Sequence, residues 1–320
     1  MTSHRLTEEA SGVFIISATP FSEDGAIDFD SLDRLVDFYL ERGVTGMTIL
    51  GMMGEAPKMT GEESRTIITR VLGRVANRVP VVVGVSNAGL DNLASLAGFA
   101  MDEGAAGVMV APQAVARTDE GVVAYFETVA ERLGPDTPVV YQDFPLTTNM
   151  PISAAAFTRI VARCPSVVML KHEDWPGLSK LSQVRAAAEA TGARRVSILC
   201  GNGGLYLPQE LSRGADGAMT GFAFPEMLVQ VVQRHRDGDA DGAEDLFDAY
   251  LPVVRHEQQP GFGLAVRKEI LRRRGIIASA TCRAPGPKLD KAGQGELTHM
   301  LDRLGRRLAE LGVTVKDPAW

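Results

Sequence analysis

Short apolar runs alternate with amphipathic stretches from residue 13 to about residue 236. Several runs are continuous Val, Ile, Met and Ala rather than alternating apolar and polar residues, which is typical of strands buried on both faces. The runs predict eight strands, at residues 13–21, 43–51, 79–85, 104–112, 137–145, 166–173, 196–202 and 214–221.

Apolar residues recur at helical spacing between these runs. The stretch 28–43 has this spacing and ends at Gly43, and the stretch 60–75 begins at Thr60, a good N-cap residue. The same pattern predicts helices at 119–134, 153–164, 177–192 and 224–238. The segments ERGVTG, DEGAAG and SRGADG each read as a helix end, a glycine stop and the entry to a parallel strand.

Eight β–α units in series predict an α/β protein with a (β/α)8 TIM barrel. An open doubly wound sheet is the alternative, although no GxGxxG follows the first strand. After residue 236 the strand signal stops, and three helices are predicted at 239–257, 262–275 and 293–312. We therefore expect a barrel over 1–236 and a C-terminal three-helix extension packed on it over 237–320.

Composition indicates an ordinary globular protein, with 45% hydrophobic and 23% charged residues. The net charge of −7 argues against nucleic acid or an anionic membrane as partner. No apolar run approaches the roughly 18 residues of a membrane span, and the polar start MTSHRLTEEASG lacks the core of a signal peptide. Three widely separated cysteines favour a reducing compartment. The sequence thus predicts a cytoplasmic protein.

Lys171 follows the buried run of the sixth strand directly, within SVVMLKHEDWPG. A desolvated ammonium group tends to lose its proton, and the neutral amine is the usual source of a Schiff base with a carbonyl substrate. Alternatively, Lys171 is structural and snorkels or pairs with Glu173 or Asp174. In a TIM barrel the active site lies at the strand C-termini, where this lysine falls.

Other candidate residues also end strands. Tyr141 ends the fifth, thirty residues before Lys171, and a phenol there could relay protons to the imine. The loop GMMGE at 51–55 could offer backbone N–H groups to a carboxylate. His172, next to Lys171, should face the other side of the sheet. The candidate substrate-binding residues are Thr19, Gly51, Met52, Met53, Gly54, Glu55, Asn202 and Thr220.

No metal or cofactor is predicted. The five histidines are dispersed, without HExxH or two-histidine–carboxylate spacing. No GxSxG, Walker or kinase motif is present.

The set of motifs resembles the dihydrodipicolinate synthase / N-acetylneuraminate lyase family. Four motifs support the resemblance: TPF ending the first strand, the GxxGE loop, a tyrosine ending the fifth strand and a lysine ending the sixth. Residues 13–275 fit the order of elements in the family. The resemblance implies a class I mechanism: Lys171 forms an imine with a 2-oxo acid such as pyruvate, Tyr141 relays protons, and the 51–55 loop seats the carboxylate. It also implies a homotetramer.

Departures from the family pattern reduce the number of activities that the sequence is consistent with. Met52 and Met53 replace two hydroxyl residues, and the QDFP segment is one residue longer than usual. Leu146, Thr147 and Thr148 stand where the synthases carry an arginine for the second substrate. GADGAMTGFAFPE, LPVVRHEQQPG, GIIASATCRAPGPKL and YQDFP look most like the 2-keto-3-deoxy sugar-acid dehydratases, such as that for L-2-keto-3-deoxyarabonate.

The leading interpretation is therefore a Schiff-base lyase, either a dehydratase or an aldolase. We expect it to act on a small 2-oxo acid, namely a 2-keto-3-deoxy sugar acid or a pyruvate adduct. Three alternatives stay open: condensation of pyruvate with an aldehyde as in dihydrodipicolinate synthase, a barrel that binds a 2-oxo acid without turning it over, and a different chemistry in which Lys171 is an ion-pair partner.

Overall fold

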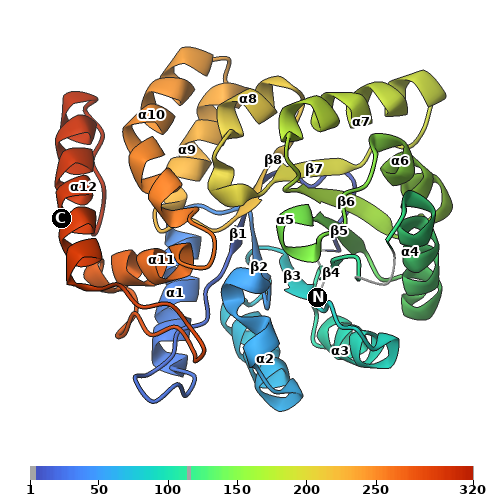
Figure 1. Ribbon diagram of the computed structural model, residues 1–320, viewed down its shortest axis with the longest axis horizontal. Helices are drawn as coiled ribbons and strands as arrows, with labels where there is room; N and C mark the ends of the chain where they lie inside the picture. The colour runs from blue at the N-terminus through green and yellow to red at the C-terminus, as the bar shows by residue number, and fades with distance from the viewer. Residues whose placement is uncertain (1–4, 114–116, 320) are drawn as a thin grey trace.

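The eight predicted strands form a closed parallel barrel in the order of the sequence, as the computed structural model shows over residues 5–113 and 117–319 (Figure 1). The α/β class and the TIM barrel are confirmed. The strands are β1 (Gly12–Ile16), β2 (Gly46–Ile49), β3 (Val81–Gly84), β4 (Gly107–Val110), β5 (Val139–Asp143), β6 (Val167–His172), β7 (Ser197–Cys200) and β8 (Gly217–Thr220). Residues 1–4, the first part of the polar segment MTSHRLTEEASG, lie outside the described residues.

Helices surround the barrel and follow its strands (Figure 1). They are α1 (Phe29–Glu41), α2 (Gly61–Val75), α3 (Leu90–Asp102), α4 (Asp119–Leu133), α5 (Pro145–Thr148), α6 (Ala154–Arg163), α7 (Gly177–Thr191), α8 (Leu207–Ser212) and α9 (Pro225–Arg236). The six helices that the sequence predicted between the strands are confirmed as α1, α2, α4, α6, α7 and α9. The sequence pattern did not single out α3 and α8, because α3 lacks a side-chain N-cap and α8 is only six residues long.

Three glycines end helices as predicted. Gly43, Gly104 and Gly214 have φ values of 76°, 100° and 92°, in the left-handed region that favours glycine. Thr60 caps α2 through a capping box with Glu63, again as expected. At these glycines the helix ends and the chain returns to the N-terminal end of the barrel, so that the next strand runs parallel to the last.

The barrel is filled by an inner layer of side chains, while a much larger outer layer joins strands to helices. The inner layer is formed by Leu6, Phe14, Ile16, Val82, Ala106, Met109, Val140, Val168, Met169, Leu199 and Met219. Because inner and outer residues alternate along a strand, the face of a residue at a strand end follows from its position in the register.

The chain continues after the barrel into α10 (Ala240–Glu257), α11 (Gly263–Arg273) and α12 (Lys291–Glu310), the three helices of the predicted extension. Figure 1 shows α12 at the edge of the molecule beside α10, with α11 below α10 and close to the barrel. The division of the chain at residues 236 and 237 stays a prediction. Within the described residues, no helix combines the length and the apolar character that crossing a bilayer demands.

Candidate active site at the mouth of the barrel

Lys171 lies near the C-terminal end of β6 with its side chain buried at the mouth of the barrel. Its Nζ is 2.8 Å from Oε2 of Glu173, which is buried as well. Gln142 on β5 is the register partner of Lys171, and its Nε2 donates to the same Glu173 oxygen at 3.0 Å. Lys171 and Glu173 therefore form the ion pair that the sequence offered as an alternative. This pair places an amine and a carboxylate in direct contact.

A small cavity of about 70 Å³ opens beside this pair. Loops after several strands and two segments of the C-terminal extension form its wall. The lining residues are Ile16, Met52, Met53, Gln142, Phe144, Lys171, Glu173, Asn202, Gly203, Thr220, Gly221, Gln258 and Arg267.

Four of the predicted substrate-binding residues line this cavity. Met52 and Met53 enter it from a single 3₁₀ turn after β2. Asn202 donates through Nδ2 to the backbone oxygen of Glu173 at 3.0 Å, and the Thr220 hydroxyl accepts from the backbone N–H of Gly203 at 2.7 Å. These bonds fix the wall of the cavity, while a substrate-binding role for the four residues stays a proposal.

Three other predicted residues support the loop and do not line this cavity. The Thr19 hydroxyl donates to the backbone oxygen of Gly54 at 2.7 Å. The buried Glu55 carboxylate accepts from Lys268 of α11 at 2.5 Å and from Lys58 at 2.8 Å. In the structure these residues hold the 51–55 loop, and their role in substrate binding stays a prediction. Gly51 lines a second, larger cavity described below.

Tyr141 does not meet Lys171, contrary to the prediction. Because Gln142 pairs with Lys171, Tyr141 faces the opposite side of β5, in the layer between strands and helices. Its ring packs against Phe126 and Phe157, with centroids 4.5 and 5.6 Å away. Burial, reinforced by the charges of nearby carboxylates, raises the pKa of this phenol well above its ordinary value. Tyr141 is a core residue and cannot relay protons to Lys171 from this face.

The Tyr141→Phe variant tests this correction. We expect kcat/KM to stay within about twofold of the wild type, because the hydroxyl lies away from the amine. Stability should be unchanged or higher by about 1 kcal/mol, because the hydroxyl has no hydrogen-bond partner among the described residues. Thermal unfolding and steady-state kinetics measure the two effects. A large loss of kcat with a normal melting temperature would contradict the core assignment.

His172 faces away from the amine, as expected. Its Nε2 is 2.9 Å from the backbone oxygen of Gly177, and its Nδ1 is 3.8 Å from Oδ2 of Asp143. Burial, the largest single effect, lowers the pKa of His172, but Asp143, the charge of Glu210 and the Gly177 carbonyl together outweigh it, so that the net pKa is raised. Lys180 joins Asp143 and Asp174 at 2.6 and 2.8 Å. This outer network buttresses the ends of β5 and β6 behind the cavity.

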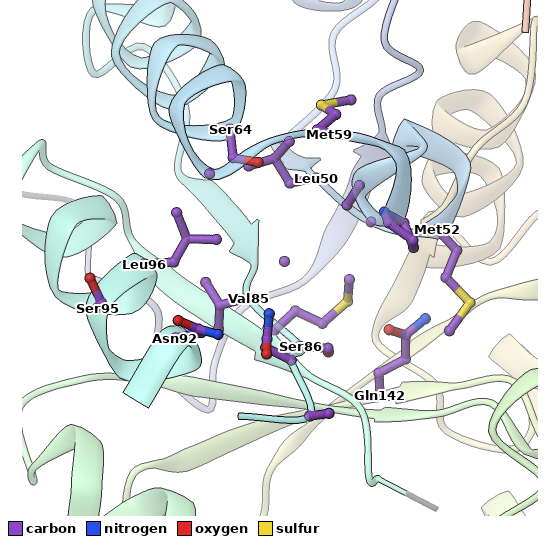
Figure 2. A pocket seen from close by; sticks show the side chains of 18 of the residues that line it. Leu50, Met52, Met59, Ser64, Val85, Ser86, Asn92, Ser95, Leu96 and Gln142 are labelled. Carbon is purple, nitrogen blue, oxygen red and sulfur yellow. The ribbon is translucent and has the colours of Figure 1, made fainter. Parts of the chain in front are cut away.

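A second cavity, of about 690 Å³, adjoins the first. Figure 2 shows it between α2 and α3, with Gln142 and Met52 together on one side and Asn92 and Ser95 of α3 on the other. Because Met52 and Gln142 line both cavities, they form the wall that the cavities share. Among the described residues, no three His, Cys, Asp or Glu side chains are grouped so that they could hold a metal ion.

Sequence reasoning missed four polar side chains that line the cavity beside Lys171. Glu173 was considered only as a structural partner of Lys171, although its spacing of two from the lysine on one strand is a signal for a shared face. Gln142 was passed over in favour of Tyr141. Gln258 lies in LPVVRHEQQPG, which was used only for its resemblance to the dehydratases, and Arg267 lies outside every motif that was singled out.

The model of the dihydrodipicolinate synthetase family matches residues 9–304. The chain belongs to this family. It is accordingly a class I lyase of the Schiff-base type.

Individual relatives span most of the chain. The L-2-keto-3-deoxyarabonate dehydratase of Azospirillum brasilense is 30% identical over 303 residues, covering 92% of this chain and 94% of that protein. The 4-hydroxy-tetrahydrodipicolinate synthase of Sorangium cellulosum is 31% identical over 247 residues, covering 76% and 79%. The crystal structure of dihydrodipicolinate synthase from Rhodopseudomonas palustris has a TM-score of 0.92 and 48% identity, covering 94% of this chain and 100% of that one. YagE from E. coli K12, solved with pyruvate, has a TM-score of 0.83 and 25% identity, covering 92% and 98%.

Proposed function

We propose that this chain is a lyase for a 2-keto-3-deoxy sugar acid, with Lys171 as the imine-forming residue and Glu173 as the proton-transfer group. The observation that carries the proposal is the buried contact of 2.8 Å between the amine and the carboxylate at the barrel mouth. An amine must be neutral to attack a ketone, and Glu173 is placed to accept its proton.

The reaction begins when Nζ of Lys171 attacks C2 of the 2-oxo acid. Glu173 returns the proton of the amine to the oxygen on C2, so that water leaves and its carboxylate is ionised again, and the protonated imine makes the C3–H bond acidic by drawing electrons towards its nitrogen. Glu173 then removes a proton from C3, which gives the enamine. In a dehydratase the C4 hydroxyl leaves next and takes a proton from Glu173. Water finally hydrolyses the imine, which frees Lys171 and the product.

The larger cavity supports a hydroxylated substrate. The small cavity of about 70 Å³ suits the 2-oxo acid end. Met52 and Gln142 open onto a larger space whose lining includes the neutral polar residues Ser86, Asn92 and Ser95, and one cation, Arg65. Such groups are suited to hydrogen bonds with sugar hydroxyls. The 30% identical dehydratase from Azospirillum brasilense, which the alignment covers almost completely, supports the same choice.

Condensation of pyruvate with an aldehyde is the second candidate, because several relatives and the 48% identical structure carry the synthase name. The segment Pro145–Thr148 argues against it, since Leu146, Thr147 and Thr148 offer no cation for a second carboxylate. Leu146 is 62% exposed rather than aimed at a ligand. The cytoplasmic location and the homotetramer stay predictions.

A panel of 2-oxo acids tests the proposal. We expect a 2-keto-3-deoxypentonic acid to be consumed, with a product one water molecule lighter in the mass spectrum. Aldol cleavage would release pyruvate and an aldehyde instead, and condensation would consume pyruvate together with an aldehyde. If no 2-oxo acid is consumed or trapped, the chain is a binding barrel and the proposal is wrong.

A further inference from the structure

Arg267 reaches the active-site cavity from α11, in the C-terminal extension. The side chain is 1% exposed. Its Nε donates to Oε2 of Glu257 at 2.8 Å, and its Nη2 donates to the backbone oxygen of Gly221 at 2.6 Å. Two of the three guanidinium nitrogens are thus held by fixed groups of the protein.

Glu257 is itself held in place, because its other carboxylate oxygen accepts from the backbone N–H of Ala223 at 3.2 Å. The guanidinium plane therefore cannot turn freely. The third nitrogen of Arg267, Nη1, is buried and has no acceptor in the described part of the chain. Buried N–H donors without an acceptor are costly and rare, so an acceptor is expected at this point.

Gly221 leaves the space that Nη1 occupies. A Cβ at this position would lie 2.0 Å from Nη1, too close for any side chain unless Arg267 moved. Gly221 and Arg267 both line the cavity that contains Lys171. Arg267 and Lys171 therefore line one cavity, with Nη1 buried beside Gly221 at its wall.

Charge identifies the missing acceptor. Of the described residues that line the cavity, three are charged: Lys171 and Glu173 pair with each other, whereas Arg267 pairs with Glu257 outside the lining and keeps Nη1 without an acceptor among the described residues. Met52 and Met53 bring no hydroxyl group. We infer that Arg267 binds the carboxylate of the 2-oxo acid through Nη1, and so sets the preference of the site for acids over neutral ketones. This inference rests on the proposed function.

The Arg267→Lys variant tests the inference, because lysine keeps a cation beside Glu257 but lacks the second amino group. The probes are pyruvate and its uncharged ester methyl pyruvate, each trapped on Lys171 with borohydride. We expect the half-saturating concentration of pyruvate to rise about 10- to 100-fold, the effect of one charge-assisted hydrogen bond, and that of methyl pyruvate to change less than about twofold. An equal change for both probes, or none for pyruvate, would overturn the inference; the second result would mean that Nη1 binds only water.

Gly221→Ala is a second test that leaves every charge in place. The added methyl group should displace Nη1 and cause the same selective weakening for pyruvate, and an unchanged pyruvate saturation would count against the inference. If wild-type protein traps no 2-oxo acid, the proposed function fails separately. Calorimetric titration with pyruvate then decides: binding that is lost in Arg267→Lys supports the carboxylate site, whereas equal or absent heats in both proteins overturn it.

Discussion

Lys171→Ala is expected to lower kcat/KM by about 10⁴-fold or more, because it removes the atom that bonds to the substrate. The second signature is chemical. Wild-type protein treated with pyruvate and borohydride should gain the mass of one reduced adduct, located on Lys171 by peptide mapping. The variant should gain nothing, and neither protein should be labelled on Lys180, the buried lysine that pairs with Asp143 and Asp174.

Lys171→Arg is the matched control. Arginine keeps a positive charge beside Glu173 but cannot form the imine. A fold with normal melting temperature and no turnover would assign the loss to covalent chemistry. Turnover that persists in Lys171→Arg with a shifted pH profile would instead show that Lys171 acts as an ion-pair partner, and the proposed mechanism would be wrong.

Glu173→Gln should lower kcat by about 10²- to 10⁴-fold, the usual contribution of general acid–base catalysis. Glutamine keeps the size of the side chain but cannot take up the C3 proton. The direct measurement is deuterium exchange at the methyl group of pyruvate in D₂O, followed by NMR. Wild-type protein should catalyse this exchange through the enamine, and the variant should lose it while borohydride still traps some imine.

Asp174→Asn provides a control at the next residue, because Asp174 contacts Lys180 on the outer network and not Lys171. Methyl exchange should remain close to the wild-type rate in this variant. Exchange that survives in Glu173→Gln, or that is lost equally in both variants, would mean that another group removes the proton.

The places of the strands along the chain could be predicted, because uninterrupted apolar runs mark them. The eight strands follow from uninterrupted apolar runs, and Lys171 is recognisable because a charge ends such a run. The faces of the strands were harder to predict. A strand buried on both sides has no alternation to read, so the sequence does not say which of Tyr141 and Gln142 points inward.

An irregularity in the sheet adds to the difficulty. The register between β5 and β6 shifts at Val139 and Val140, so that two successive β6 residues, Val168 and Met169, both contribute to the inner layer. Counting thirty residues from Tyr141 to Lys171 therefore could not decide whether they share a face. Arg267 was unpredictable for another reason: its partner Gly221 lies 46 residues earlier in the chain, Glu257 lies on a different helix, and a helical arginine usually points to solvent.

The attachment of α11 to the barrel mouth has a consequence for the order in which the protein is made. Glu55, in the loop after β2, is translated more than two hundred residues before its partner Lys268. A nascent chain that has already emerged with all eight strands still holds this carboxylate without that cation and lacks the guanidinium of Arg267. The barrel mouth therefore gains both side chains only after all eight strands have been made, and a chain that stopped after residue 236 would lack them.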